Sequence, residues 1–253
     1  MNVFLWIVSL IRTAAFLAMA FPASGLTIAR IKYTSHNWQE IGNPTSIAAR
    51  RQWGHVVLGV ALTRIKVENA ELLSADEPVV LMTNHSSQLD IPAALALHPG
   101  ELRIIAKAEL GRKPFIGAYL KQGHFLLSRE TSLRAAIRAD REMLLAAAEY
   151  AAKHRVSILV FPEGTRSTDG KLQEFKHGAF LAAIKAGLPI QPVAFLGAHE
   201  ILPKGAIRLR EFRTIRAVVC AKVQTAGRHW HDVAADVRKA LIDAGVPDGL
   251  ATT

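Results

Sequence analysis

The chain has 253 residues, of which 50% are hydrophobic and 21% charged, and it contains no low-complexity tract and no internal repeat. These properties exclude a disordered chain and a repeat solenoid, and they predict a globular protein with a sizeable core. Lys and Arg outnumber Asp and Glu by 31 to 21, so the net charge of +10 at pH 7 favours anionic partners: nucleic acid, anionic lipid headgroups or phosphorylated metabolites.

An apolar segment, residues 3–21, opens the chain, but it carries Arg12 near its middle. An arginine at the centre of a bilayer costs about 2.5 to 3.5 kcal/mol, which disfavours a single clean membrane span. A secretory signal peptide is a second interpretation, because the segment contains the small-residue stretch from Ala18 to Ala20. Against it, no Lys or Arg precedes the apolar core.

A second apolar segment, residues 53–62, is short for a membrane span and suits a buried or interfacial helix. We therefore predict that residues 1–66 form a membrane-seating helical pair on an anionic surface, followed by a domain over 67–253. The alternative is that both helices simply pack on the core. Nucleic acid is not an expected partner, because zinc-finger spacing and RNA-binding signatures are absent. The basic residues that flank the two segments are Arg30, Lys32, Arg50, Arg51, Arg64 and Lys66.

From residue 65 onward, short β-rich runs alternate with helical runs, which predicts an α/β fold with a layered, mixed, largely parallel sheet flanked by helices. One helix is expected over 131–153, where Thr131 or Ser132 can cap it, and another over 179–186, where Gly187 stops it. Ligands of such folds gather at the carboxyl ends of the strands. The expected strands are 65–67, 79–82, 102–105, 124–127, 157–161 and 190–195.

The stretch NHSSQLD, residues 84–90, follows one of these apolar strands. If a helix opens near Ser87, Asp90 lies in its first turn and can accept a hydrogen bond from one nitrogen of His85. The other imidazole nitrogen is then free to remove a proton from a bound hydroxyl. Taken alone, the same spacing also fits a capped helix, with Ser86 or Ser87 at the N-cap and a solvated histidine.

A second polar stretch, FPEGTRS, follows the strand at 157–161. Gly164 lets backbone amides approach a ligand closely, while Thr165 and Arg166 supply a hydroxyl and a forked cation that suit phosphate oxygens. Glu163 would then buttress a basic side chain. The alternative is a polar surface turn with an ordinary Glu and Arg pair. Arg129, at another strand end, is a second candidate phosphate ligand.

Two other kinds of chemistry have little support in the sequence. The ten histidines show no H-E-x-x-H motif, and the nearest pair, His229 and His231, lacks obvious partners, so we expect no metal. No G-x-S-x-G elbow surrounds Ser86 or Ser87, which argues against a serine nucleophile.

Together these segments resemble the 1-acylglycerol-3-phosphate acyltransferase family, whose members carry an N-H-x4-D block and an F-P-E-G-T-R block. The resemblance runs from about residue 65 to 205 and includes 106–110 with 114–117, 175–179 and 188–193. It implies that His85 is a base oriented by Asp90, and that Lys107 has a possible active-site role. Phosphate recognition is implied for Arg129, Glu163, Gly164, Thr165 and Arg166.

This chain departs from the family pattern at Ser128, where an acidic residue often precedes the arginine, and this departure concerns the choice of headgroup more than the reaction. Beyond residue 205 the family signal is weak. Basic residues from position 204 onward are interpreted either as a lipid-facing stripe or, with a slight preference, as the solvated face of a strand. These residues are Lys204, Arg208, Arg210, Arg213 and Arg216.

The resemblance implies an O-acyltransferase of phospholipid biosynthesis that acylates lysophosphatidic acid to phosphatidic acid. The donor would be an acyl thioester of coenzyme A or acyl carrier protein, with no other cofactor, at the cytoplasmic face of the cell membrane. An alternative keeps the chemistry but uses another acceptor, such as lyso-ornithine lipid or glycerol-3-phosphate. A different alternative is a non-catalytic basic module that docks on anionic membranes or nucleic acid.

Overall fold

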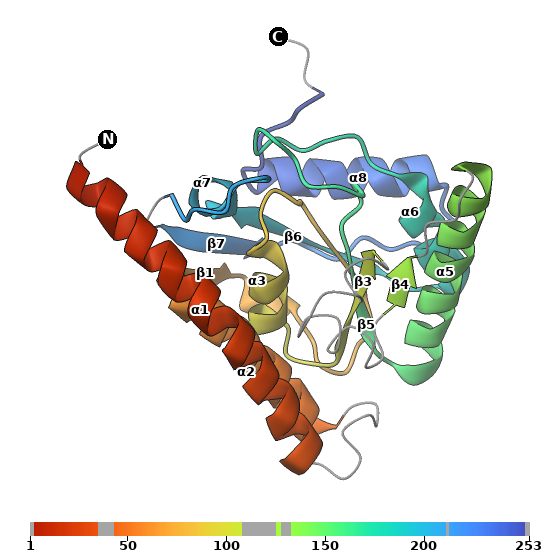
Figure 1. Cartoon of the computed structure of the whole chain (residues 1–253). Helices are drawn as coiled ribbons and strands as arrows, with labels where there is room; N and C mark the ends of the chain where they lie inside the picture. Colours follow the sequence, from red (N-terminus) through yellow and green to blue (C-terminus); the bar gives the residue numbers. More distant parts are fainter. Residues whose placement is uncertain (1–2, 35–42, 108–124, 128–132, 211–212, 251–253) are drawn as a thin grey trace.

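The computed structural model describes residues 3–34, 43–107, 125–127, 133–210 and 213–250 (Figure 1). Its centre is a seven-stranded sheet with the order β1-β7-β6-β2-β5-β3-β4. Neighbouring strands run parallel except β6 and β7, which pair antiparallel. The strands are β1 (Arg64–Glu68), β2 (Val80–Thr83), β3 (Leu102–Lys107), β4 (Phe125–Leu127), β5 (Ser157–Val160), β6 (Ile190–Leu196) and β7 (Thr214–Val219).

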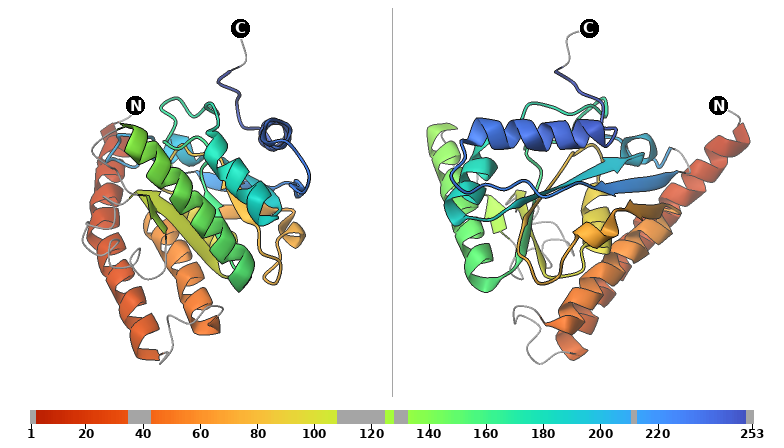
Figure 2. Two further views of the ribbon diagram at one scale, coloured as in Figure 1. Left: turned by 90° about the vertical axis from the view of Figure 1, so that its right-hand side faces the viewer. Right: turned by 180° about the vertical axis from the view of Figure 1, so that it is seen from behind.

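Helices cover both faces of this sheet, as the two views of Figure 2 show. One layer is formed by α5, α6 and α8, and the other contains α2 and α3, with α1 lying outside α2. The helices are α1 (Val3–Thr34), α2 (Pro44–Val60), α3 (Asp90–Leu97), α5 (Leu133–His154), α6 (His177–Ala186), α7 (Ala198–Ile201) and α8 (Trp230–Asp243), with a short 3-10 helix, η1 (Ala70–Leu72).

The central strands are apolar on both faces because each face is covered by helices. In β2, Val80 and Met82 pack into the core beneath α5, α6 and α8, whereas Leu81 packs into the core on the opposite face. All three side chains are buried. Period-two alternation between two cores explains why the sequence of this strand reads as a continuous apolar run. The predicted fold class, a largely parallel layered α/β sheet, is confirmed.

The predicted elements match the observed ones with small shifts at their ends. Gly187 has a φ of 66° and ends α6 in the left-handed conformation, as expected from its position. The residues proposed to cap the helix at 131–153 lie outside the described residues, as does His124. The strand β7 was not among the predicted strands, and its antiparallel pairing with β6 makes the sheet mixed.

The helix α2 contains most of the predicted 53–62 segment and packs directly on α3. A Cβ at Gly54 would come within 2.5 Å of the Pro92 carbonyl oxygen and 2.7 Å of the Ala96 nitrogen, so the two backbones touch. The close packing fixes α3, which begins with Asp90. The predicted boundary between residues 66 and 67 falls inside β1, whose residues pair with β7. The division into two domains stays a prediction.

Three polar residues of α1, Ser9, Arg12 and Thr13, face the protein. Arg12 is 3% exposed, and its Nε donates to the Ala61 carbonyl at 2.7 Å. Ser9 donates to the Leu209 carbonyl, and the Leu209 amide donates to Thr13 Oγ1 at 2.9 Å. The arginine that disfavoured a membrane span therefore serves to dock the helix on the protein.

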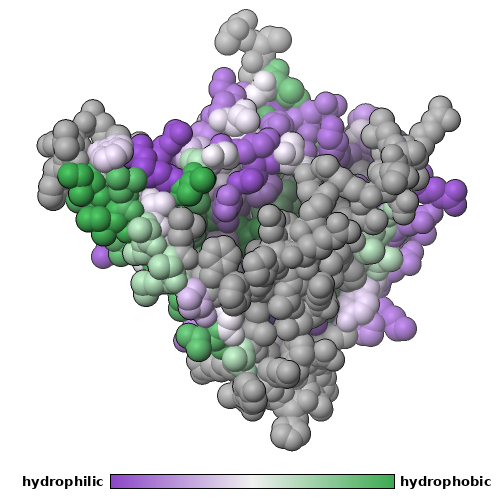
Figure 3. Space-filling model, in the orientation of Figure 1, coloured by the Kyte–Doolittle hydropathy of each residue, from purple (hydrophilic) through white to green (hydrophobic). Residues whose placement is uncertain are grey.

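The opposite side of α1 is apolar and exposed. Figure 3 shows hydrophobic residues gathered over this helix at the left edge of the molecule. Among the described residues, no helix is both long enough and apolar enough to cross a bilayer. The exposed large side chains of α1 are Trp6, Ile7, Leu10, Ile11, Met19 and Leu26.

Candidate active site

The loop that follows β2 is fixed to the neighbouring strand β6 by Asn84. The Asn84 side chain donates to the Phe195 carbonyl at 2.9 Å and accepts from the Phe195 amide at 2.7 Å. Asn84 thus continues the backbone pairing beyond the end of β2. The residue is 4% exposed, and both polar atoms of its side chain are hydrogen-bonded. The next residue, His85, is held at the carboxyl end of a central parallel strand, where ligands of α/β folds bind.

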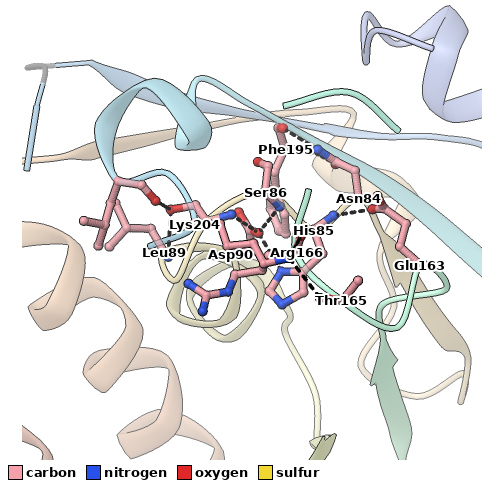
Figure 4. A network of polar contacts seen from close by, with 12 residues as sticks. Asn84, His85, Ser86, Leu89, Asp90, Glu163, Thr165, Arg166, Phe195 and Lys204 are labelled. Atoms are coloured by element: carbon pink, nitrogen blue, oxygen red, sulfur yellow. Dashed lines mark hydrogen bonds and ion pairs between the residues drawn. The ribbon is translucent and has the colours of Figure 1, made fainter. Parts of the chain in front are cut away.

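His85 and Asp90 form the predicted pair. The distance from His85 Nδ1 to Asp90 Oδ2 is 2.8 Å, and the same oxygen accepts from the Ser86 and Ser87 amides, each at 2.8 Å (Figure 4). An ionised carboxylate only accepts hydrogen bonds, so Nδ1 carries the proton and Nε2 keeps its lone pair. Asp90 thereby selects the tautomer in which the outer nitrogen can act as a base.

The helix begins at Asp90 rather than near Ser87, which corrects the expected helix start. The N-cap position is Leu89, and no side chain caps it. Ser87 instead donates to the Leu202 carbonyl at 2.8 Å and accepts from the Leu89 amide at 3.1 Å. Both serines are buried in a compact turn, so neither is the helix cap that the alternative interpretation required.

The imidazole ring of His85 is held between a carboxylate and an aromatic ring. It stacks on Phe161 with 3.7 Å between ring centroids and 17° between planes. Its side chain is 15% exposed. Stacking and the Asp90 contact together fix the ring orientation while leaving part of the ring open, as proton transfer to a bound substrate requires.

Glu163 supports the backbone of His85 from the neighbouring loop. Its carboxylate accepts from the His85 amide at 2.6 Å, and from the Gln173 backbone and side-chain nitrogens at 2.9 and 3.3 Å. Burial raises the pKa of the Glu163 carboxyl, while the N–H donors of Gln173 and His85 act in the opposite direction. We expected Glu163 to buttress a basic side chain, but its partners among the described residues are amide groups. It binds the two loops together.

The segment from Gly164 to Arg166 joins the histidine loop directly. The Ser167 amide donates to the His85 carbonyl at 2.7 Å, so Arg166 adjoins a residue bonded to His85. Gly164 adopts a φ of 70°, where a side chain would be strained. Arg166 Nη1 is buried without a hydrogen-bond partner in the described part of the chain. A guanidinium with an unused donor is ready to bind an anion.

The positions of two predicted site residues relative to His85 and Arg166 cannot be given. Lys107 is the last residue of β3, and only its backbone is described. Arg129 lies outside the described residues. Within the ranges that the structure covers, no cluster of three or more His, Cys, Asp or Glu side chains could hold a metal ion.

Several residues of the site went unnoticed in the sequence. Gln173 clamps Glu163 and also donates to the Thr165 carbonyl at 3.0 Å, yet it lies eight residues beyond Thr165 in a stretch without periodicity. Asn84 stands in the same block as His85 and could have been singled out as a polar residue directly after a buried strand. Lys204 was noticed only as one of several basic residues interpreted as a lipid-facing stripe or, with a slight preference, as a solvated strand face. The structure places it against Thr165 and Arg166 instead.

A histidine oriented by a buried carboxylate, beside a loop with an unused arginine donor, can remove a proton from a hydroxyl of an anionic substrate. The chain belongs to the Acyltransferase family, because the family model of that description matches residues 64–196. Over 158 residues it is 34% identical to the chloroplastic 1-acyl-sn-glycerol-3-phosphate acyltransferase LPAT1 of Arabidopsis thaliana. That match covers 62% of this chain and 42% of the plant protein.

Other comparisons point the same way. The putative 1-acyl-sn-glycerol-3-phosphate acyltransferase acl-2 of Caenorhabditis elegans is 31% identical over 169 residues, covering 64% of this chain and 56% of that protein. The chain spans about half the length of the curated relatives that it matches. The crystal structure of the 1-acyl-sn-glycerophosphate (LPA) acyltransferase PlsC from Thermotoga maritima shares the fold. It has a TM-score of 0.79 and 24% identity, and the match covers 95% of this chain and 97% of that one.

Proposed function

We propose that the protein is an O-acyltransferase that moves a fatty acyl group from an acyl thioester to the free hydroxyl of lysophosphatidic acid, giving phosphatidic acid for phospholipid synthesis. The proposal rests on one observation, the hydrogen bond that joins the loop of His85 to the loop of Arg166. The Ser167 amide binds the His85 carbonyl, which puts the Arg166 loop beside the oriented imidazole. The printed names of the curated relatives support the choice of acceptor.

In the proposed reaction, His85 Nε2 removes the proton of the acceptor hydroxyl as the hydroxyl oxygen attacks the thioester carbonyl carbon. The carbon–sulfur bond then breaks, and the leaving thiolate takes the proton from the imidazolium. Asp90 stabilises the imidazolium that forms between these steps, because its buried carboxylate contacts Nδ1. The thioester is already activated, so no covalent acyl-enzyme is needed.

The acceptor phosphate is proposed to bind the segment from Gly164 to Arg166. The Thr165 hydroxyl and the Arg166 guanidinium offer side-chain donors, and the absent side chain of Gly164 leaves its backbone accessible. Such a cradle holds the hydroxyl in register with the base and the thioester carbonyl. Orientation of this kind is worth several kcal/mol, up to about 7 to 11 kcal/mol in the best intramolecular reactions. We also propose that Arg129 binds the acceptor phosphate and that Lys107 takes part in substrate binding.

The purified protein, assayed with labelled acyl thioester, is expected to acylate lysophosphatidic acid in preference to lyso-ornithine lipid and glycerol-3-phosphate. The reason is that the segment from Gly164 to Arg166 can bind a phosphate, while the exposed apolar surface of α1 can bind the acyl chain of the same lipid. Parallel assays with acyl-coenzyme A and acyl-acyl carrier protein identify the donor. A preference for either of the other acceptors would reject the proposed substrate while keeping the reaction. Absence of acyl transfer to any acceptor would favour the non-catalytic membrane module.

We propose that α1 seats the protein on the cytoplasmic face of a cell membrane. The support is the inverted pattern of the helix, whose polar residues Ser9, Arg12 and Thr13 face the protein while its large apolar residues face outward. An exposed apolar face of this extent favours a lipid surface, and the net positive charge favours an anionic one.

Replacing Ile11, which is 65% exposed, with glutamate is expected to weaken binding to phosphatidylglycerol vesicles about tenfold, because burial of an isoleucine side chain is lost and a charge is introduced. Co-sedimentation measures the change. Leu250→Glu is the matched control, since Leu250 is 56% exposed near the other end of the chain. If both substitutions weakened vesicle binding equally, α1 would not be the membrane-binding element.

A further inference from the structure

A loop formed by residues 202–210 connects the active site with α1. At one end, Ser87 Oγ donates to the Leu202 carbonyl at 2.8 Å, and Ser87 and Pro203 form an antiparallel bridge. At the other end, Leu209 exchanges hydrogen bonds with Ser9 and Thr13 of α1. The loop is therefore fixed at both ends, on the catalytic turn and on the exposed apolar helix.

Lys204 extends from this loop onto the segment that carries Arg166. Its Nζ donates to the Arg166 carbonyl at 2.8 Å and to Thr165 Oγ1 at 3.3 Å. Figure 4 shows Lys204, Thr165 and Arg166 in one cluster with His85. A lysine ammonium has three donors, and two are engaged here, so one remains for a ligand.

Two cationic side chains of this cluster, those of Lys204 and Arg166, keep donors that the described residues do not use. Neither Lys204 nor Arg166 forms an ion pair with a carboxylate in the ranges that the structure describes. Arg166 Nη1 is buried and unpartnered within the same ranges. Lys204 contacts the segment that carries Arg166, so two positive charges belong to one small region, where a bound anion would reduce their repulsion. The unused donors of the two cations therefore suit the oxygens of an anionic group.

We propose that Lys204 binds the phosphate of the lysophospholipid acceptor and is a specificity-determining residue of the acceptor site, acting with Thr165 and Arg166. The inference rests on the proposed function. The acceptor, rather than a phosphorylated donor, is favoured because the loop leads from Lys204 to the protein-facing side of α1, the helix whose other side exposes the apolar residues where the tail of a lipid would lie. Lysine supplies a compact charge, and the guanidinium supplies directional donors, so the two contribute differently to one phosphate.

Lys204→Met is expected to raise KM for lysophosphatidic acid about 10- to 100-fold, the range for a hydrogen bond to a charged group. The KM for acyl-coenzyme A stays within about threefold, because Lys204 is proposed to bind the acceptor and not the donor. Lys204→Arg, which keeps the charge, restores most of the affinity. Lys239→Met on α8 is the control, since Lys239 is an exposed lysine paired with Asp243 and lies outside the active site.

Monoacylglycerol, an acceptor without phosphate, separates phosphate binding from a structural role. If Lys204 binds phosphate, Lys204→Met leaves the slow turnover of monoacylglycerol unchanged and collapses the preference for lysophosphatidic acid. Equal losses on both acceptors would mean that Lys204 only supports the Arg166 carbonyl, and this would overturn the proposal. A rise in the KM for acyl-coenzyme A alone would overturn it in favour of the donor phosphates.

Binding of glycerol-3-phosphate, measured by phosphorus NMR line broadening, tests the site without turnover. Stronger broadening with the wild-type protein than with Lys204→Met is expected. Failure of the wild-type protein to acylate lysophosphatidic acid would reject the proposed function, and the binding measurement would still decide the role of Lys204. Equal broadening by the two proteins would overturn that role, whatever the acceptor is.

Discussion

Replacing His85 with alanine is expected to lower kcat about 10²- to 10⁴-fold, which is the usual contribution of a positioned general base. The imidazole is the group whose free nitrogen, Nε2, can take the acceptor proton, because Nδ1 is bound to Asp90. The loss is measured as the rate of acyl transfer to lysophosphatidic acid at saturating concentrations of both substrates.

The fold of this variant should persist, because the loop is also held by bonds that do not involve the imidazole. Glu163 binds the His85 backbone amide, and Asn84 binds β6. Thermal unfolding and vesicle binding check that these properties are kept. His231→Ala is the matched control, since that histidine is exposed on α8. Turnover within about threefold of the wild type would remove His85 from the base role.

Replacing Asp90 with asparagine is expected to lower kcat about 10²- to 10⁴-fold, no more than the loss of His85 itself, because Asp90 acts through His85. An amide oxygen can still accept from the Ser86 and Ser87 amides, so the turn can keep its shape. The amide cannot stabilise the imidazolium with a full negative charge, and it no longer enforces the tautomer with the proton on Nδ1. The substitution therefore removes the negative charge beside the imidazole while the shape of the turn is kept.

The measurement for this variant is kcat together with KM for both substrates. We expect KM to change little, because Asp90 is buried and contacts His85 and the turn rather than the proposed phosphate site. Asp243→Asn, at an exposed position of α8, is the control. A large rise in KM with unchanged kcat would indicate that Asp90 shapes the acceptor site instead of orienting the base.

Local patterns in the sequence predicted much of the fold. Buried strands are short apolar runs because helices cover both faces of the sheet, and this composition is visible without coordinates. The helix end at Gly187 follows from the freedom of glycine to adopt a positive φ. The strand β7, which lies between β1 and β6, was not among the predicted strands, because alternating exposed and buried residues give it a weaker apolar signal. Arg216 lies at an exposed position of this strand, in line with the preferred interpretation of its basic residues as a solvated strand face.

The sequence by itself determined the fold class and the two polar blocks that follow β2 and β5. His85 and Asp90 are five residues apart, so a single turn brings them together, and the carboxyl ends of neighbouring parallel strands lie at one edge of a sheet. Tertiary structure alone decided which distant residues complete the site. Gln173 and Lys204 reach it through loops without periodicity, and Arg12 faces the protein because the helix docks by its polar side. Contacts of this kind form only when segments distant in the sequence pack together in the folded chain, so no residue spacing in the sequence predicts them.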